Sequence, residues 1–270
     1  MNQGHYTVND LLRVMQRLRD PEGGCPWDLK QNFRSIVPST LEECYELAEA
    51  IEHGDYPHVA EELGDVLFQV VFYARLGEEQ GVFSFPEIVH TLVDKLLRRH
   101  PHVFANGKIE GIVDVSVDVV EVKRSWEAIK REERAARAQG GVLDDVPVAL
   151  PALPRAQKLQ KRAALVGFDW ADATAVLAKL DEERGELEEA MKSGTQSAVA
   201  DEMGDLLFTC VNLARQLGLD AEATLRQASA KFEQRFRAME VSAAGAGKAD
   251  LASLTAAELD ALWRSAKASR

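Results

Sequence analysis

The chain has 270 residues, of which 46% are hydrophobic and 28% charged, a composition typical of globular proteins. Its formal net charge of −12 argues against nucleic acid as a partner, because a phosphate backbone would be repelled. No apolar run approaches the roughly 20 residues that span a bilayer. The first residues, MNQGHYTVND, lack the pattern of a signal peptide. We therefore expect a cytoplasmic protein that binds no membrane, with Cys25, Cys44 and Cys210 as reduced thiols.

Helical periodicity dominates the chain, and strand signals are nearly absent, which predicts an all-α fold. Residues 20–28 are expected to be loop because they contain a Gly pair and two prolines, and residues 53–57 a turn. Residues 108–119 are expected to be extended or loop, and residues 243–248 a flexible loop. The predicted helices cover residues 8–19, 40–51, 59–79, 86–99, 121–138, 155–165, 173–192, 196–217, 221–240 and 256–268.

The clearest linker is residues 140–154, which hold two Gly, three Pro and no helical period. It separates two sets of helices. We predict an N-terminal helical domain at 1–115, a charged helix and linker at 116–150, and a C-terminal helical domain at 151–270.

An internal repeat relates the two halves. ELGDVLFQVVFYAR (62–75) and EMGDLLFTCVNLAR (202–215) match at 8 of 14 positions. Four acids recur at a constant offset of 140 residues: Glu43, Glu46, Glu62 and Asp65 against Glu183, Glu186, Glu202 and Asp205. A pair of cations follows each copy at a slightly different offset: Lys95 with Arg99, and Lys231 with Arg235. These matches predict a duplicated helical unit.

The acids of each copy stand beside an unusually apolar helix. Residues three apart share a helix face, so Glu62 and Asp65 project together. The helix that follows Glu62 is apolar nearly all round, which predicts burial in a core, with the acids at its rim or inside it. Buried carboxylates need cations or donors. The acids are therefore interpreted as a divalent-metal site, with a structural ion-pair network or a solvated face as alternatives.

The donor types favour a hard ion. Oxygen-only ligation suits Mg²⁺ or Mn²⁺, whereas zinc favours His or Cys. All six histidines lie at or before position 102, and the Glu-x-x-His motif of ferritin-like di-iron sites is absent. Lys231 with Arg235, and Lys179 one turn before Glu183, could hold a polyphosphate or belong to a solvated face. Trp263 is interpreted as either a core residue or a base-stacking platform.

Several short segments of the sequence resemble those of the MazG nucleoside triphosphate pyrophosphohydrolases. The strongest are the two copies of E-E-x-x-E, each followed by E-x-G-D-L/V-L-F. The resemblance spans nearly the whole chain and includes CPWD (25–28), FQVVFYA (68–74), RRHPHVF (98–104), VGFDW (166–170) and KFEQRF (231–236). P-loop and G-x-S-x-G motifs are absent.

The resemblance implies an all-α homodimer. It implies Mg²⁺-dependent hydrolysis of NTPs and dNTPs to monophosphate and pyrophosphate, with catalysis in the C-terminal domain. The implied catalytic metal ligands are Glu183, Glu186, Glu202 and Asp205. The implied nucleotide contacts are Lys179, Glu183, Asp201, Asp205, Lys231, Arg235 and Trp263. The N-terminal acids Glu43, Glu46, Glu62 and Asp65 form a second candidate metal set, whose role as active, regulatory or structural stays open.

The hypothesis for the mechanism is in-line attack by an activated water, which Glu183 or Glu186 orients or deprotonates. Two alternatives belong to other functional classes. One is a dUTPase-like enzyme of narrow specificity, and the other is a non-enzymatic helical binding module whose acids form ion pairs.

Overall fold

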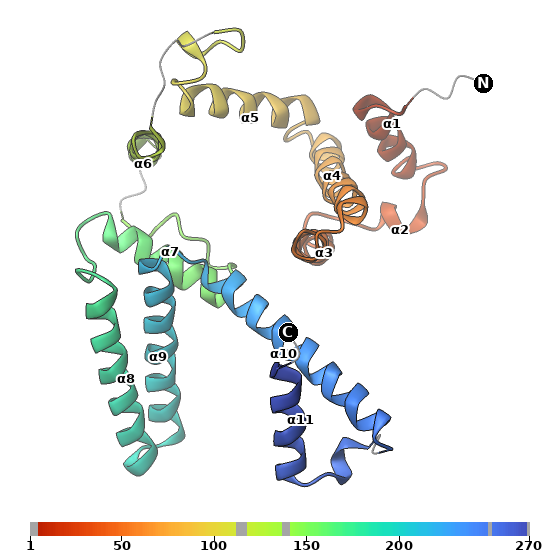
Figure 1. Cartoon of the computed structure of the whole chain (residues 1–270). Coiled ribbons are helices and arrows are strands. Elements are labelled where there is room, and N and C mark those ends of the chain that lie inside the picture. Colours follow the sequence, from red (N-terminus) through yellow and green to blue (C-terminus); the bar gives the residue numbers. More distant parts are fainter. Residues whose placement is uncertain (1–4, 112–117, 137–140, 248–249, 269–270) are drawn as a thin grey trace. The chain divides into compact units, whose positions relative to one another are not determined.

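A computed structural model describes residues 5–111, 118–136, 141–247 and 250–268 (Figure 1). Within these ranges the chain forms helices and no strands, as the all-α prediction requires. The α-helices are α1 (Val8–Leu18), α2 (Pro26–Leu29), α3 (Val37–His53), α4 (Tyr56–Gln80), α5 (Phe85–Arg99), α6 (Val119–Ala136), α7 (Ala152–Ala164), α8 (Ala173–Ser193), α9 (Gln196–Gln216), α10 (Ala221–Gly245) and α11 (Ala256–Ala268). Short 3₁₀ turns, η1 and η2, occupy Ala105–Gly107 and Leu251–Ser253.

Three of the predicted element boundaries need correction. Residues 20–28 are not entirely loop, because Pro26 at the first helical position starts the short helix α2. Residues 243–248 were predicted as loop, but α10 continues to Gly245 through an Ala-rich stretch with high helix propensity. Helix α7 begins at Ala152, inside the predicted linker, with Pro154 in its first turn. Residues 112–117 of the predicted extended segment lie outside the described residues.

Contacts along the chain divide it into two compact units, Met1–Glu132 and Glu133–Arg270. The division falls inside the predicted charged helix and linker at 116–150. Each unit is built around one long helix hairpin, α3–α4 in the first and α8–α9 in the second. No helix of the described residues combines the length and the apolar character needed to cross a membrane.

In the first unit, α4 packs against α1, α3 and α5. The α3–α4 turn is tight because Gly54 adopts a left-handed conformation (φ 71°) and the Asp55 side chain caps α4 by accepting from the His58 amide. Buried apolar side chains from three segments form the core: Met15, Ile36, Val71, Phe72 and Leu76. This core fixes the face of α4 that is turned towards its neighbours.

In the second unit, α9 packs against α8, α7 and α10, and α11 packs against α10. Figure 1 shows α8 and α9 as an antiparallel pair. Side-chain caps start the long helices: Asp172 for α8, Thr195 for α9 and Asp220 for α10. The last helix, α11, begins at a capping box, in which Glu258 accepts from the Thr255 amide at 2.9 Å.

The apolar helices of the repeat are buried on one side only. Val71 and Phe72 of α4 lie in the core, but Leu63 is 52% exposed and Leu67 38% exposed. On α9, Leu207 is 54% exposed. Val70 and Phe208 are likewise exposed. The prediction of all-round burial is therefore wrong for the single chain, because the neighbours within each unit leave one face of each helix uncovered.

Candidate metal centres

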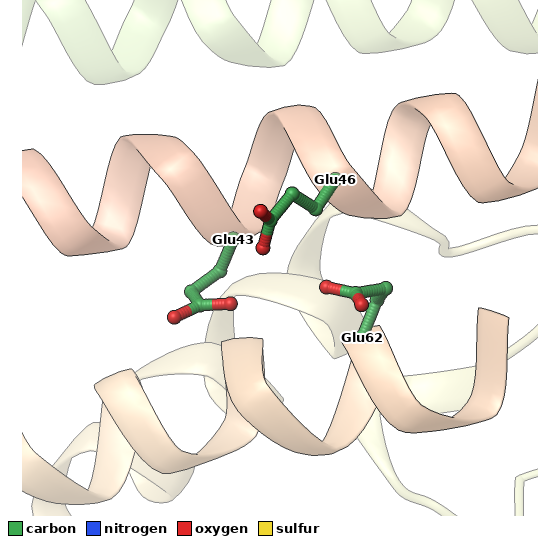
Figure 2. A group of neighbouring side chains, drawn as sticks. All are labelled: Glu43, Glu46 and Glu62. Atoms are coloured by element: carbon green, nitrogen blue, oxygen red, sulfur yellow. The ribbon is translucent and has the colours of Figure 1, made fainter. Parts of the chain in front are cut away.

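Three carboxylates of the first unit meet between the two helices of its hairpin. Glu43 and Glu46 come from α3 and Glu62 from α4, and Figure 2 shows their carboxyl groups turned towards the same space. One oxygen of each residue lies within 4.8 Å of the corresponding oxygens of the others. The i, i+3 spacing places Glu43 and Glu46 on one face of α3, and the close turn at Gly54 brings α4 back alongside. The group is called the first cluster below.

The second unit repeats this arrangement at the positions 140 residues further on. Glu183 and Glu186 lie on α8 and Glu202 on α9, again with one oxygen of each within 4.8 Å of the others. This group is called the second cluster. Three of the four acids predicted for each copy are therefore brought together.

The fourth acid of each set lies outside the three-carboxylate group. Asp65 and Asp205 occur three residues after Glu62 and Glu202, on the same helices, and both are exposed. Asp65 is nevertheless near enough for its charge to act on Glu43. Their role as metal ligands stays a prediction.

The two clusters bury different acids and give them different partners. In the first, Glu62 is 7% exposed and its Oε1 lies 2.8 Å from Nε2 of His58. In the second, Glu183 is 5% exposed and its Oε1 lies 2.8 Å from Nζ of Lys179, which also donates to Glu182. Both partners stand four residues before the acid they contact, one helical turn away.

Like charges and desolvation disfavour the charged form of one carboxyl group in each cluster. Partial desolvation, followed by the charges of Asp65, Glu46, Glu62 and Glu42, raises the pKa of the Glu43 carboxyl group. Partial desolvation also raises the pKa of Glu186. There Lys179 acts in the opposite direction, and the acids Glu183, Glu202 and Glu182 add to the rise. Hydrogen bonds to Glu182 and Glu183 raise the pKa of Lys179 above its ordinary value. The ammonium group of Lys179 therefore stays charged.

These residues fit a hard divalent cation. Carboxylate oxygens are the ligands that Mg²⁺ and Mn²⁺ favour, and a cation between the carboxylates would relieve their mutual repulsion. In the first cluster, Oε2 of Glu62 is buried and has no hydrogen-bond partner. Such an atom is costly unless something binds it.

The other predicted nucleotide contacts lie on three further stretches of the second unit. Asp201 is exposed on α9, beside Glu202. Lys231 and Arg235 lie one turn apart on α10, outside the hairpin that carries the acids. Trp263 of α11 contacts Phe232, the neighbour of Lys231, with ring centroids 5.2 Å apart. The structure thus joins Trp263 to the cationic stretch of α10, and contact of these residues with a nucleotide stays a prediction.

His58 was missed by the sequence interpretation. It precedes Glu62 by four residues, a spacing at which helical side chains meet. That spacing could have identified it, but the internal repeat gives no signal at this position, because the corresponding residue of the second copy is Ala198.

Two copies of one helix hairpin, each with three converging carboxylates, define an all-α protein with two candidate metal centres. A family model for the MazG nucleotide pyrophosphohydrolase domain matches residues 31–104 and 172–239, which include both hairpins. The chain belongs to this family.

Two relatives match over nearly the whole chain, and a third matches over part of it. The nucleoside triphosphate pyrophosphohydrolase of Escherichia coli (strain K12) is 48% identical, over 99% of this chain and 98% of its own length. The nucleoside triphosphate pyrophosphohydrolase/pyrophosphatase MazG of Thermotoga maritima is 40% identical over the same shares. The nucleoside triphosphate pyrophosphohydrolase of Mycolicibacterium smegmatis is 36% identical over 59% of this chain and 46% of its own.

Proposed function

We propose that this chain is a nucleoside triphosphate pyrophosphohydrolase that converts NTPs and dNTPs to the monophosphate and pyrophosphate, using Mg²⁺ or Mn²⁺. The observation that carries the proposal is the second cluster, Glu183, Glu186 and Glu202, with Lys179 beside it. Family membership supports it, as do relatives that span nearly the whole chain and are named nucleoside triphosphate pyrophosphohydrolases.

The second cluster has the parts that the reaction needs. A bound divalent ion would neutralise phosphate charge and make a nearby water more acidic. Glu183, Glu186 and Glu202 would hold that ion, with Asp205 as a further ligand. Glu186 is exposed, so it can accept a proton from that water at the open side of the cluster.

The cations of the second unit suit the other end of the substrate. Lys179 has three donor hydrogens and can exchange a carboxylate partner for a phosphate oxygen. Lys231 and Arg235 would stabilise the pyrophosphate that leaves when water displaces it at the α-phosphorus. Asp201 and Trp263 would contact the nucleoside. The acids of the second cluster and the net charge of −12 would repel a bare polyphosphate, which supports a nucleotide substrate that arrives with its own cation. The same net charge supports the proposal that the protein binds neither nucleic acid nor membrane.

We further propose a cytoplasmic homodimer. The exposed apolar faces of α4 and α9, with Leu63 and Leu207 more than half exposed, are what a second copy would cover. The three cysteines are free, which fits a reducing compartment.

Product analysis tests the activity. The full-length protein is incubated with each of the eight common nucleotides and Mg²⁺, and the products are separated by ion exchange. We expect monophosphate and pyrophosphate in equal amounts. Orthophosphate with a nucleoside diphosphate would refute the proposal. Turnover of dUTP alone would favour the narrow dUTPase-like alternative, and no turnover would favour the binding module.

The matched variant is Glu202→Gln, which removes one carboxylate of the second cluster without changing its size. We expect loss of activity with unchanged helicity in far-ultraviolet circular dichroism. Full activity in a folded Glu202→Gln protein would mean that the site is elsewhere.

A further inference from the structure

The two clusters differ in the charge that stands among their acids. Lys179 brings a permanent cation to the second cluster, with Nζ at 2.8 Å from both Glu182 and Glu183. The corresponding position in the first copy is Ser39, which carries no charge. Among the described residues, no Lys or Arg forms an ion pair with Glu43, Glu46 or Glu62. Glu62 is paired instead with the imidazole of His58, which can donate a hydrogen bond without a charge.

An unpaired atom marks the first cluster as incomplete. Glu62 is more than nine-tenths buried, and its Oε2 has no hydrogen-bond partner, while its carboxyl group is turned towards Glu43 and Glu46 (Figure 2). In the second cluster no oxygen of the buried Glu183 is left in this state among the described residues. The first cluster therefore has both more uncompensated negative charge and a buried carboxylate oxygen without a hydrogen-bond partner.

We infer that the first cluster is the tighter metal site, which holds a divalent ion without nucleotide, and that the second cluster takes its ion together with the nucleotide. An ion entering the second cluster meets the charge of Lys179, and one unit charge at this range changes ion affinity strongly. When a polyphosphate accepts the hydrogen bonds of Lys179, Glu183 is released for the ion. This inference rests on the proposed function for the second cluster and gives the first cluster a role as a standing metal centre.

Mn²⁺ is the probe, because its free concentration can be followed by electron paramagnetic resonance. The full-length protein is stripped with chelator and titrated with Mn²⁺ in the absence of nucleotide. We expect two classes of site, one of each per chain, whose dissociation constants differ by about tenfold or more. Two equal classes, or no binding, would overturn the inference.

Matched substitutions assign the classes. Glu46→Gln should abolish the tight class, and Glu186→Gln, 140 residues further on, should abolish the weak one. The opposite assignment would overturn the inference. Circular dichroism checks the fold of each variant.

An exchange of the charge gives a second, independent test. Lys179→Gln should tighten the weak class by about tenfold, and Ser39→Lys should weaken the tight class by a similar factor. These variants keep all six carboxylates, so they show which cluster holds the tight class even if a Glu→Gln variant does not fold. Unchanged affinities in both would mean that Lys179 is not the cause.

The nucleotide part has its own readout. A non-hydrolysable ATP analogue, with a methylene group between the α- and β-phosphorus atoms, should tighten only the weak class. Tightening of both classes, or of neither, would contradict the inference. Failure of the proposed function is distinguishable, because it would appear as missing pyrophosphate from natural NTPs while the two Mn²⁺ classes persist.

Discussion

The two hairpins carry the same three carboxylates but shield different ones. In α3–α4 the buried acid is Glu62, on the second helix, and in α8–α9 it is Glu183, on the first. In both cases a basic partner one turn earlier covers the buried acid: His58 in one hairpin and Lys179 in the other. A duplicated acid pattern therefore does not fix the electrostatics of a site, because residues outside the pattern decide how much negative charge stays uncompensated.

The largest expected difference between the hairpins is catalytic. Glu186→Gln should lower kcat by at least about a hundredfold, because loss of a metal ligand exceeds the usual effect of an outer-shell change. Glu46→Gln should change kcat by less than about threefold, because Ser39, which has no charge to bind phosphate, stands where the second copy has Lys179. Steady-state rates of pyrophosphate release measure both. Equal losses would show that both clusters turn over, and the distinction between them would fall.

The exposed apolar faces provide the next comparison. Leu67 and Leu207 occupy equivalent positions, but Leu207 is 54% exposed and Leu67 38%. In the proposed dimer a second copy would cover these leucines. Replacing one of them by Glu should therefore raise the dimer dissociation constant by about tenfold or more, since burial of a Leu contributes about 2 kcal/mol. Leu207→Glu should have the larger effect. Sedimentation velocity over a concentration series checks this, and a wild-type protein that stays monomeric would refute the dimer proposal.

The raised pKa values predict a pH effect on stability. A carboxyl group whose pKa is higher in the folded state binds more protons there, so its contribution to stability falls as pH rises from the ordinary Glu range to the raised value. The melting temperature of metal-free Glu43→Gln, relative to wild type, should therefore increase with pH across this window. Glu186→Gln should show a smaller increase, because Lys179 already offsets part of the repulsion.

Differences between wild type and variant are needed, since the lowered pKa of Glu79, held down mainly by its hydrogen bond from Arg19, acts in the opposite direction. Melting curves in chelator over a pH series give the result. If the melting temperature of a variant relative to wild type fell as the pH rises, the raised pKa of the replaced carboxyl group would be contradicted. Saturating Mn²⁺ should abolish the advantage of both variants.

The smallest expected effect concerns Gly185, which stands where the first copy has Tyr45. A Cβ at Gly185 would meet no atom within 4 Å. Gly185→Ala should therefore raise the free energy of unfolding by about 0.5–1 kcal/mol through helix propensity. Urea denaturation measures this, with Gly54→Ala as a destabilised control because Gly54 is left-handed. A destabilised Gly185→Ala protein would indicate that a partner approaches α8 closely.

Sequence alone predicted the helices and the pairing of the acids well, for a physical reason. Both depend on short-range periodicity: i, i+3 acids on one helix, and close turns that make hairpins. The failures were at Pro26 and Gly245, where residues that usually end helices are tolerated at the first position or the last turn. Exposure of Leu63 and Leu207 could not be predicted, because an apolar pattern does not say whether the covering surface belongs to the same chain. The pairing of the buried acids with His58 and Lys179 could not be predicted either, because it depends on which carboxylate of each cluster is buried.

Each cluster takes its three carboxylates from a single hairpin, whose two helices are joined by a very short turn: Gly54–Asp55 in one and Gly194–Thr195 in the other. Contacts of this kind are local in sequence and form early during folding. The three carboxylates therefore come together when the hairpin closes, and no other helix of the described residues contributes a carboxylate to the group. Divalent ions present during synthesis would then favour closure, and refolding after denaturation should be faster in Mg²⁺ than in chelator.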